Sequence, residues 1–152
     1  MKGRKFAISL VVVLSIGIFA AAGCLYAAET DAAYKAMVEG AKQMMDANKK
    51  IMDKMAKKGM MDAELTAADK MMKEGYDMIM KGQAMVATNK AEAQKMASHG
   101  GKMMMDAQKK IAAAVEKKGM TQACYDDFAQ CKLGEQKIKE GALQWFFGSP
   151  GI

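Results

Sequence analysis

The stretch Gly40-Ala-Lys-Gln-Met-Met-Asp-Ala-Asn-Lys-Lys-Ile51 recurs 60 residues later as Gly100-Gly-Lys-Met-Met-Met-Asp-Ala-Gln-Lys-Lys-Ile111. Residues 40–63 align with 100–123 without a gap, with 14 identities in 24 positions. A composition rich in Met, Ala and Lys raises the number of single identities expected by chance. It does not explain runs of four consecutive identical residues at one fixed offset. The chain therefore contains an internal duplication.

Each copy is predicted to form a helix, a turn and a second helix. The first apolar stripe has helical spacing and comprises Tyr34, Met37, Val38, Ala41, Met44, Met45, Ile51, Met52 and Met55. Gly59 follows two lysines and suits a left-handed helix C-cap. Thr66 with Asp69 is predicted to cap the second helix, Asn89 the third, and Thr121 is predicted to begin the fourth.

These patterns predict an all-α fold. No strand-like alternation is present, and the only proline is Pro150. Four helices of roughly 24–29 residues with short connections indicate an up-down-up-down four-helix bundle made from a duplicated helical hairpin. Repeat 1 covers about 34–89, repeat 2 about 90–147, and residues 148–152 form a tail. Copy one is expected to pair with copy two about a pseudo-two-fold axis; the alternative is two hairpins that associate only on dimerisation.

The N-terminus is typical of an exported protein. Three basic residues in the first five positions precede an uncharged apolar run over 6–22. Ala21-Ala-Gly-Cys24 then resembles a bacterial lipobox. This resemblance implies that residues 1–23 are a signal peptide, that Cys24 receives lipid, and that 24–33 link the lipid to the helical domain.

Two other interpretations of the leader remain open. A signal peptidase could cut after Ala28, or the uncharged stretch that ends there could stay as a membrane anchor helix, since it is long enough to span a bilayer. Leu25 follows Cys24 where an inner-membrane lipoprotein commonly has Asp. The predicted location is therefore the bacterial periplasm, with the outer membrane favoured.

The charge of the chain argues against nucleic acid as a partner. Of 23 basic residues three lie in the leader, which leaves 20 against 17 acidic residues. A charge so close to balance gives no electrostatic footprint for nucleic acid. The expected partners are the membrane, through the lipid anchor, and a second envelope protein.

Cys124 and Cys131 are the two cysteines that remain after the lipobox. In an unbroken helix their Cα atoms would lie about 10.5 Å apart, beyond the roughly 7 Å limit for a disulfide. However, Lys73-Glu-Gly75 matches Lys139-Glu-Gly141 at an offset of 66, so copy two carries six extra residues in this region. We therefore predict a loop or kink closed by a Cys124–Cys131 disulfide. In a continuous helix both thiols would share a face with Met120 as a soft-metal site, or be separated by neighbouring helices.

Methionine is the most distinctive component, with 18 among 152 residues. A buried Met core explains the first stripe without any further role. In the second helix Met71, Gly75, Met78, Gly82 and Met85 repeat at spacings of four and three, and we call these residues the Met–Gly row. Either a neighbouring helix packs on this row, or its methionines Met71, Met78 and Met85 form an adaptable face for a partner protein.

The only histidine, His99, has Met96 three positions before it and Met103 four positions after it. Helical spacing places all three on one face, and thioether with imidazole suits Cu(I) or Ag(I). This spacing resembles that of Met-rich periplasmic silver- and copper-binding proteins, which implies binding of soft metal ions. Glu39 stands at the equivalent position of copy one. A boundary histidine between core methionines is the simpler interpretation, and a b-type haem bound by His99 and a methionine is a less favoured one.

No Ser/His/Asp or Cys/His constellation and no nucleotide-binding glycine loop is present, so the chain is not expected to be an enzyme. We predict a lipid-anchored envelope protein that binds Cu(I) or Ag(I) through Met96, His99 and Met103. The competing hypothesis is a structural or protein-interaction module that uses the Met–Gly row or the aromatic tail. That tail, Trp145-Phe-Phe147, is expected to pack across the end of the bundle.

Overall fold

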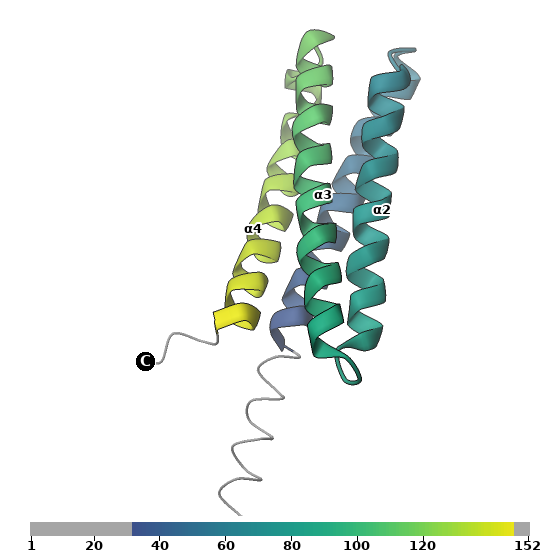
Figure 1. Cartoon of the computed structure of the whole chain (residues 1–152). Helices are drawn as coiled ribbons and strands as arrows, with labels where there is room; N and C mark the ends of the chain where they lie inside the picture. The colour runs from purple at the N-terminus through teal and green to yellow at the C-terminus, as the bar shows by residue number, and fades with distance from the viewer. Residues whose placement is uncertain (1–31, 148–152) are drawn as a thin grey trace, which may run out of the picture.

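The computed structural model describes residues 32–147, which form four helices lying side by side (Figure 1). The first helix is described over 32–57, and it is followed by α2 (Ala63–Met85), α3 (Lys90–Lys117), a 3-10 turn (Gln122–Cys124) and α4 (Tyr125–Phe147). Residues 32–147 contain no strand, so the all-α class is confirmed. None of the helices in this range is both long and apolar enough to span a bilayer. The predicted signal or anchor helix, Cys24 and the tail 148–152 lie outside the described residues.

The same turn ends the first helix of each copy. Gly59 and Gly119 have φ of 66° and 68°, a left-handed conformation that favours glycine. The residue after each glycine donates its backbone N–H to the carbonyl five positions back, at 2.9 Å in copy one and 3.1 Å in copy two. This is the Schellman pattern. The predicted cap at Gly59 is confirmed, and the duplication reproduces it at Gly119.

One predicted cap is wrong. Helix α2 begins at Ala63, because the Asp62 carboxylate accepts a hydrogen bond from the Leu65 N–H at 2.9 Å. Thr66 therefore lies inside the first turn, where its hydroxyl donates to the Asp62 carbonyl at 2.8 Å. A carboxylate immediately before the helix satisfies a free N–H and interacts favourably with the helix dipole. The predicted Asn89 cap of α3 is confirmed, with Oδ1 accepting from the backbone N–H three residues on at 3.1 Å.

Glycines bring the helices together in two close pairs. A Cβ atom at Gly40 would lie 2.5 Å from the Gly134 carbonyl oxygen, so the first helix and α4 touch through their backbones. A Cβ atom at Gly100 would lie 2.5 Å from the Gly75 carbonyl oxygen, so α2 and α3 touch in the same way. Each close pair joins a helix of copy one to a helix of copy two, as the predicted pairing of the copies requires.

Methionine supplies much of the core, as predicted. The buried methionines come from the first helix, α2, α3 and the connection before α4: Met37, Met44, Met52, Met55, Met72, Met104 and Met120. At one end of the bundle Tyr34 donates its hydroxyl hydrogen to the Ile79 carbonyl at 2.7 Å. The Tyr34 ring also meets Trp145 edge to face, with centroids 4.7 Å apart. These contacts tie the first helix to both α2 and α4.

Candidate functional site

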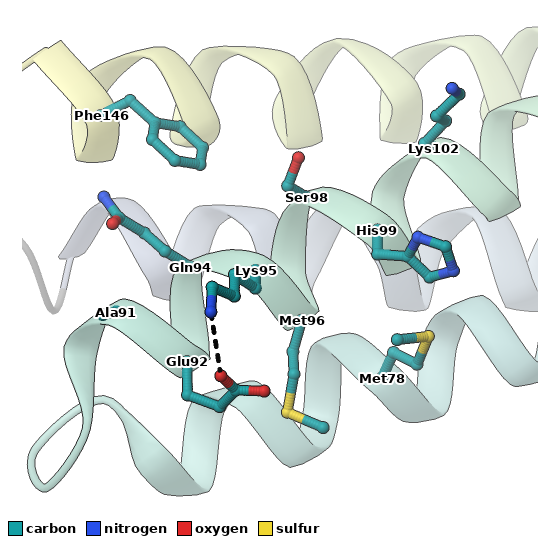
Figure 2. Close-up of a pocket in the computed structure, with 10 residues that line it drawn as sticks. All are labelled: Met78, Ala91, Glu92, Gln94, Lys95, Met96, Ser98, His99, Lys102 and Phe146. Atoms are coloured by element: carbon teal, nitrogen blue, oxygen red, sulfur yellow. Dashed lines mark ion pairs between the residues drawn. The ribbon is translucent and has the colours of Figure 1, made fainter.

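An open groove runs along the N-terminal half of α3. Its walls include Met96 and His99 from α3, Met78 from α2 and Phe146 from α4, and its volume is about 760 Å³ (Figure 2). We call it the α3 groove. Figure 2 shows Met78 reaching from α2 towards His99, while Met96 extends from α3 over α2 with its sulfur away from the imidazole. The groove therefore gathers two thioethers and the imidazole from two helices.

The close approach of α2 and α3 places these side chains together. A Cβ atom at Gly82 would lie 3.2 Å from Met96 Cβ, and one at Gly100 would lie 3.0 Å from Met78 Cβ. One turn further along α3, Met103 Cβ would lie 3.1 Å from a Cβ atom at Gly75. Because the helices are antiparallel, Met96, Met78 and Met103 follow one another along the α2–α3 contact.

The predicted trio is divided between two surroundings. Met96 is half-buried and His99 is exposed, and both line the α3 groove. Met103 is half-buried but is not among the groove residues, because it packs beside Gly75. Met78 takes its place next to His99. The sequence contained a signal for Met78, since the glycines three and four residues from it allow another helix to approach.

The Met–Gly row lies against α3. Gly75 and Gly82 are buried there, and Met71, Met78 and Met85 are half-buried. The Met71 sulfur also lies 3.9 Å from the Lys110 ammonium nitrogen. A neighbouring helix thus occupies most of this row, which was the first of its two interpretations, and only Met78 lines the groove.

The charges beside the α3 groove are partly paired. Glu92 and Lys95 form an ion pair at 3.7 Å on the α3 surface, while Lys102 lines the groove further along (Figure 2). Within residues 32–147 no three His, Cys, Asp or Glu side chains gather so that they could hold a metal ion.

The predicted Cys124–Cys131 disulfide is not present, and both cysteines are free and buried. Helix α4 runs without a break from Tyr125, so the expected loop is absent and helical rise keeps the two sulfurs apart. The Cys131 thiol lies 3.8 Å from the Met44 carbonyl oxygen, and burial raises its pKa to about 12. Burial also raises the pKa of Cys124. Neither group is poised to act as a thiolate ligand or nucleophile.

Asp127 lies between the two cysteines on the core side of α4. Its carboxylate pairs with the Lys54 ammonium at 2.6 Å, and Lys54 also donates to the Ala123 carbonyl at 2.8 Å. The hydrogen bond to Asp127 raises the pKa of Lys54. This ion pair fastens the first helix to the start of α4, a structural role that sequence reasoning missed because the partners are 73 positions apart.

Comparisons of the chain with protein-family models, curated proteins and solved structures found no match.

Proposed function

We propose that this protein is a non-enzymatic envelope protein that binds soft metal ions, Cu(I) or Ag(I), at the α3 groove. The observation that carries the proposal is that Met78, Met96 and His99 line one groove. Met103, on the same face of α3, provides a third thioether one helical turn away from the groove. Lipidation at Cys24 and a periplasmic location belong to the same proposal and are supported by the sequence of the leader.

The chemistry of the groove favours soft monovalent ions. Thioether sulfur and imidazole nitrogen are neutral ligands, and soft ligands prefer Cu(I) over hard divalent ions. Methionine side chains are also flexible, so Met78 and Met96 can turn their sulfurs towards an ion without moving their helices. The exposed position of His99 gives an ion a path from solvent.

An anaerobic titration with Cu(I) against a competing chelator tests the proposal. We expect one ion per chain, with His99→Ala weakening affinity at least tenfold, equivalent to about 1.4 kcal/mol. Met78→Leu and Met96→Leu should each weaken it as well, because leucine keeps the packing volume and removes the sulfur. The matched control is Met61→Leu, which changes an exposed methionine in the connection at the far end of α2.

The variants test the location of the site, whereas the wild-type titration tests whether the protein binds the ion at all. Unchanged affinity in His99→Ala, Met78→Leu and Met96→Leu would remove the site assignment. No stoichiometric binding by the wild-type chain would remove the function.

A protein-interaction module remains the second candidate, supported by the outer surface of α4. Leu133 and Leu143 are 49% and 58% exposed, and Tyr125 is 64% exposed on the same helix. A partner that covered these side chains would remove apolar surface from water, which is favourable. Co-purification of a defined envelope protein that Leu133→Ser releases would favour this candidate over metal binding.

A further inference from the structure

The two ends of the bundle differ in chemistry. One end carries Leu143, Phe146 and Phe147 on the last turns of α4, together with the short connection 86–89 between α2 and α3; we call it the aromatic end (Figure 1). Phe146 is 43% exposed and Phe147 81% exposed. The connection 86–89 has the sequence Val-Ala-Thr-Asn and contains no charged residue.

The opposite end is charged. Lys118 pairs with Asp62 at 2.5 Å, and Lys117 pairs with Glu64 at 3.6 Å, so ion pairs join the two connections there and the helix ends beside them. Ionic side chains of this kind stay in water, because removing a charge from water is costly. Exposed phenylalanines at the other end gain free energy when they leave water. The exposed phenylalanines therefore gather at the aromatic end, whereas the exposed apolar side chains of Met61 and Tyr125 at the other end lie among these ion pairs.

The chain enters the bundle at the aromatic end. Gly141 of α4 lies against the first helix, since a Cβ atom at Gly141 would be 2.6 Å from the Ala33 carbonyl oxygen. Cys24 precedes residue 32 by eight positions, which reach at most about 28 Å when fully extended. The first helix, at 32–57, is about 39 Å long. An anchor at Cys24, or an anchor helix that ends at Ala28, therefore keeps the aromatic end nearer the membrane than the charged end.

We infer that the aromatic end is a membrane-contact surface, with Phe146 and Phe147 inserted into the interface of the bilayer that holds the anchor. The inference rests on the proposed export and anchoring, and it is independent of metal binding. Its physical basis is that an anchored surface meets the bilayer at high local concentration, so a small apolar patch suffices to hold it there. The bundle then stands with the α3 groove close to the lipid headgroups, since Phe146 lines both surfaces.

The chain contains its own probe of this contact. Trp145 is the only tryptophan, and its ring lies 6.1 Å from that of Phe146. The full chain, purified from membranes, is reconstituted into phosphatidylethanolamine–phosphatidylglycerol vesicles with or without brominated acyl chains, and Trp145 fluorescence is compared. We expect brominated lipid to remove roughly half of the emission, because an interfacial apolar group enters the boundary by about 5–10 Å.

Two double variants distinguish membrane contact at the aromatic end from anchoring alone. Phe146→Ser/Phe147→Ser should abolish most of the quenching, whereas Tyr125→Ser/Leu133→Ser, which changes two exposed apolar residues elsewhere on α4, should leave it unchanged. Each ratio is taken against the same variant in unbrominated vesicles, so a change in intrinsic Trp145 emission cancels. All four residues are exposed, so the variants should fold.

Three outcomes would overturn the inference. A chain that floats with vesicles and carries lipid by intact mass, but shows no quenching of Trp145, is anchored without this contact, and the proposed envelope location survives. Dimers that only Phe146→Ser/Phe147→Ser dissociates would identify a second copy as the occupant of the aromatic end. Failure to float, with no lipid on the chain, would remove the anchoring proposal and the inference together.

Discussion

Adjacent glycines in α3 should respond in opposite ways to alanine. A Cβ atom at Gly100 would lie 2.5 Å from the Gly75 carbonyl oxygen and 3.0 Å from Met78 Cβ, so backbones would have to separate. At Gly101 the nearest contact is Ile138 Cγ2, at 3.2 Å, which a small side-chain shift relieves. The two positions share one helix and nearly the same unfolded-state entropy. Their difference therefore measures the close approach of α2 and α3.

The expected magnitudes follow from two opposing terms. Replacing glycine by alanine inside a helix stabilises it by about 1 kcal/mol. Overpacking a tight contact costs about 1–3 kcal/mol, and a backbone contact belongs at the upper end of that range. Gly100→Ala should thus lower the free energy of unfolding by about 1–2 kcal/mol, while Gly101→Ala should leave it unchanged or raise it by up to about 1 kcal/mol.

Urea unfolding followed by far-ultraviolet circular dichroism checks this prediction. A difference of about 2 kcal/mol between the two variants corresponds to a midpoint difference of roughly 1 M urea for a protein of this size. Equal midpoints, or a more stable Gly100→Ala, would refute the glycine-mediated contact, and with it the reason that Met78 lies beside His99.

Three further predictions concern the core around α4. Asp127→Asn should destabilise the protein by about 1–2 kcal/mol in urea titrations, less than a fully buried ion pair because Lys54 is half-exposed; stability equal to wild type would show that the pair is not structural. Stability should fall as pH rises from about 9 towards 12, because the folded pKa values of Tyr34 and Cys131 are both raised to about 12 from 10.0 and 9.0, and that of Lys54 is raised as well; Tyr34→Phe should flatten part of this fall in alkaline urea titrations, and an unchanged profile would contradict the assignment. Cys124 and Cys131 should react with a thiol reagent slowly in the native protein and fully in urea, with no reductant added; a mass lower by two hydrogens would instead show the disulfide.

The fold class followed from the sequence because the signal was repeated. Apolar spacing of three and four over more than twenty residues excludes strands, and the two lysines before Gly59 marked the first turn, which the duplication repeats at Gly119. The start of α2 was misplaced by a few residues, since Asp62 and Thr66 are both good cap residues and only the backbone decides between them.

The sequence did not show how the extra residues of copy two are accommodated or which side chains meet between helices. The loop between Cys124 and Cys131 was inferred from six extra residues, but the chain accommodates them in the connection and 3-10 turn before α4 and in the unbroken helix itself. The sequence did not place Met78 in the same groove as His99, because a single helix pattern does not show what a second helix places beside it. No local sequence pattern indicated the ion pair between Lys54 and Asp127, because the two residues are 73 positions apart.

Methyl resonances of the methionines offer the most direct test of soft-metal binding at the α3 groove. In the full chain carrying 13C-methyl methionine, addition of one equivalent of Ag(I) should shift the methyl signals of Met78 and Met96 together with the ring signals of His99. Core Met44 and far-end Met61 should not move. Spectra in which no signal shifts, or in which Met61 responds as strongly as Met78, would contradict the account.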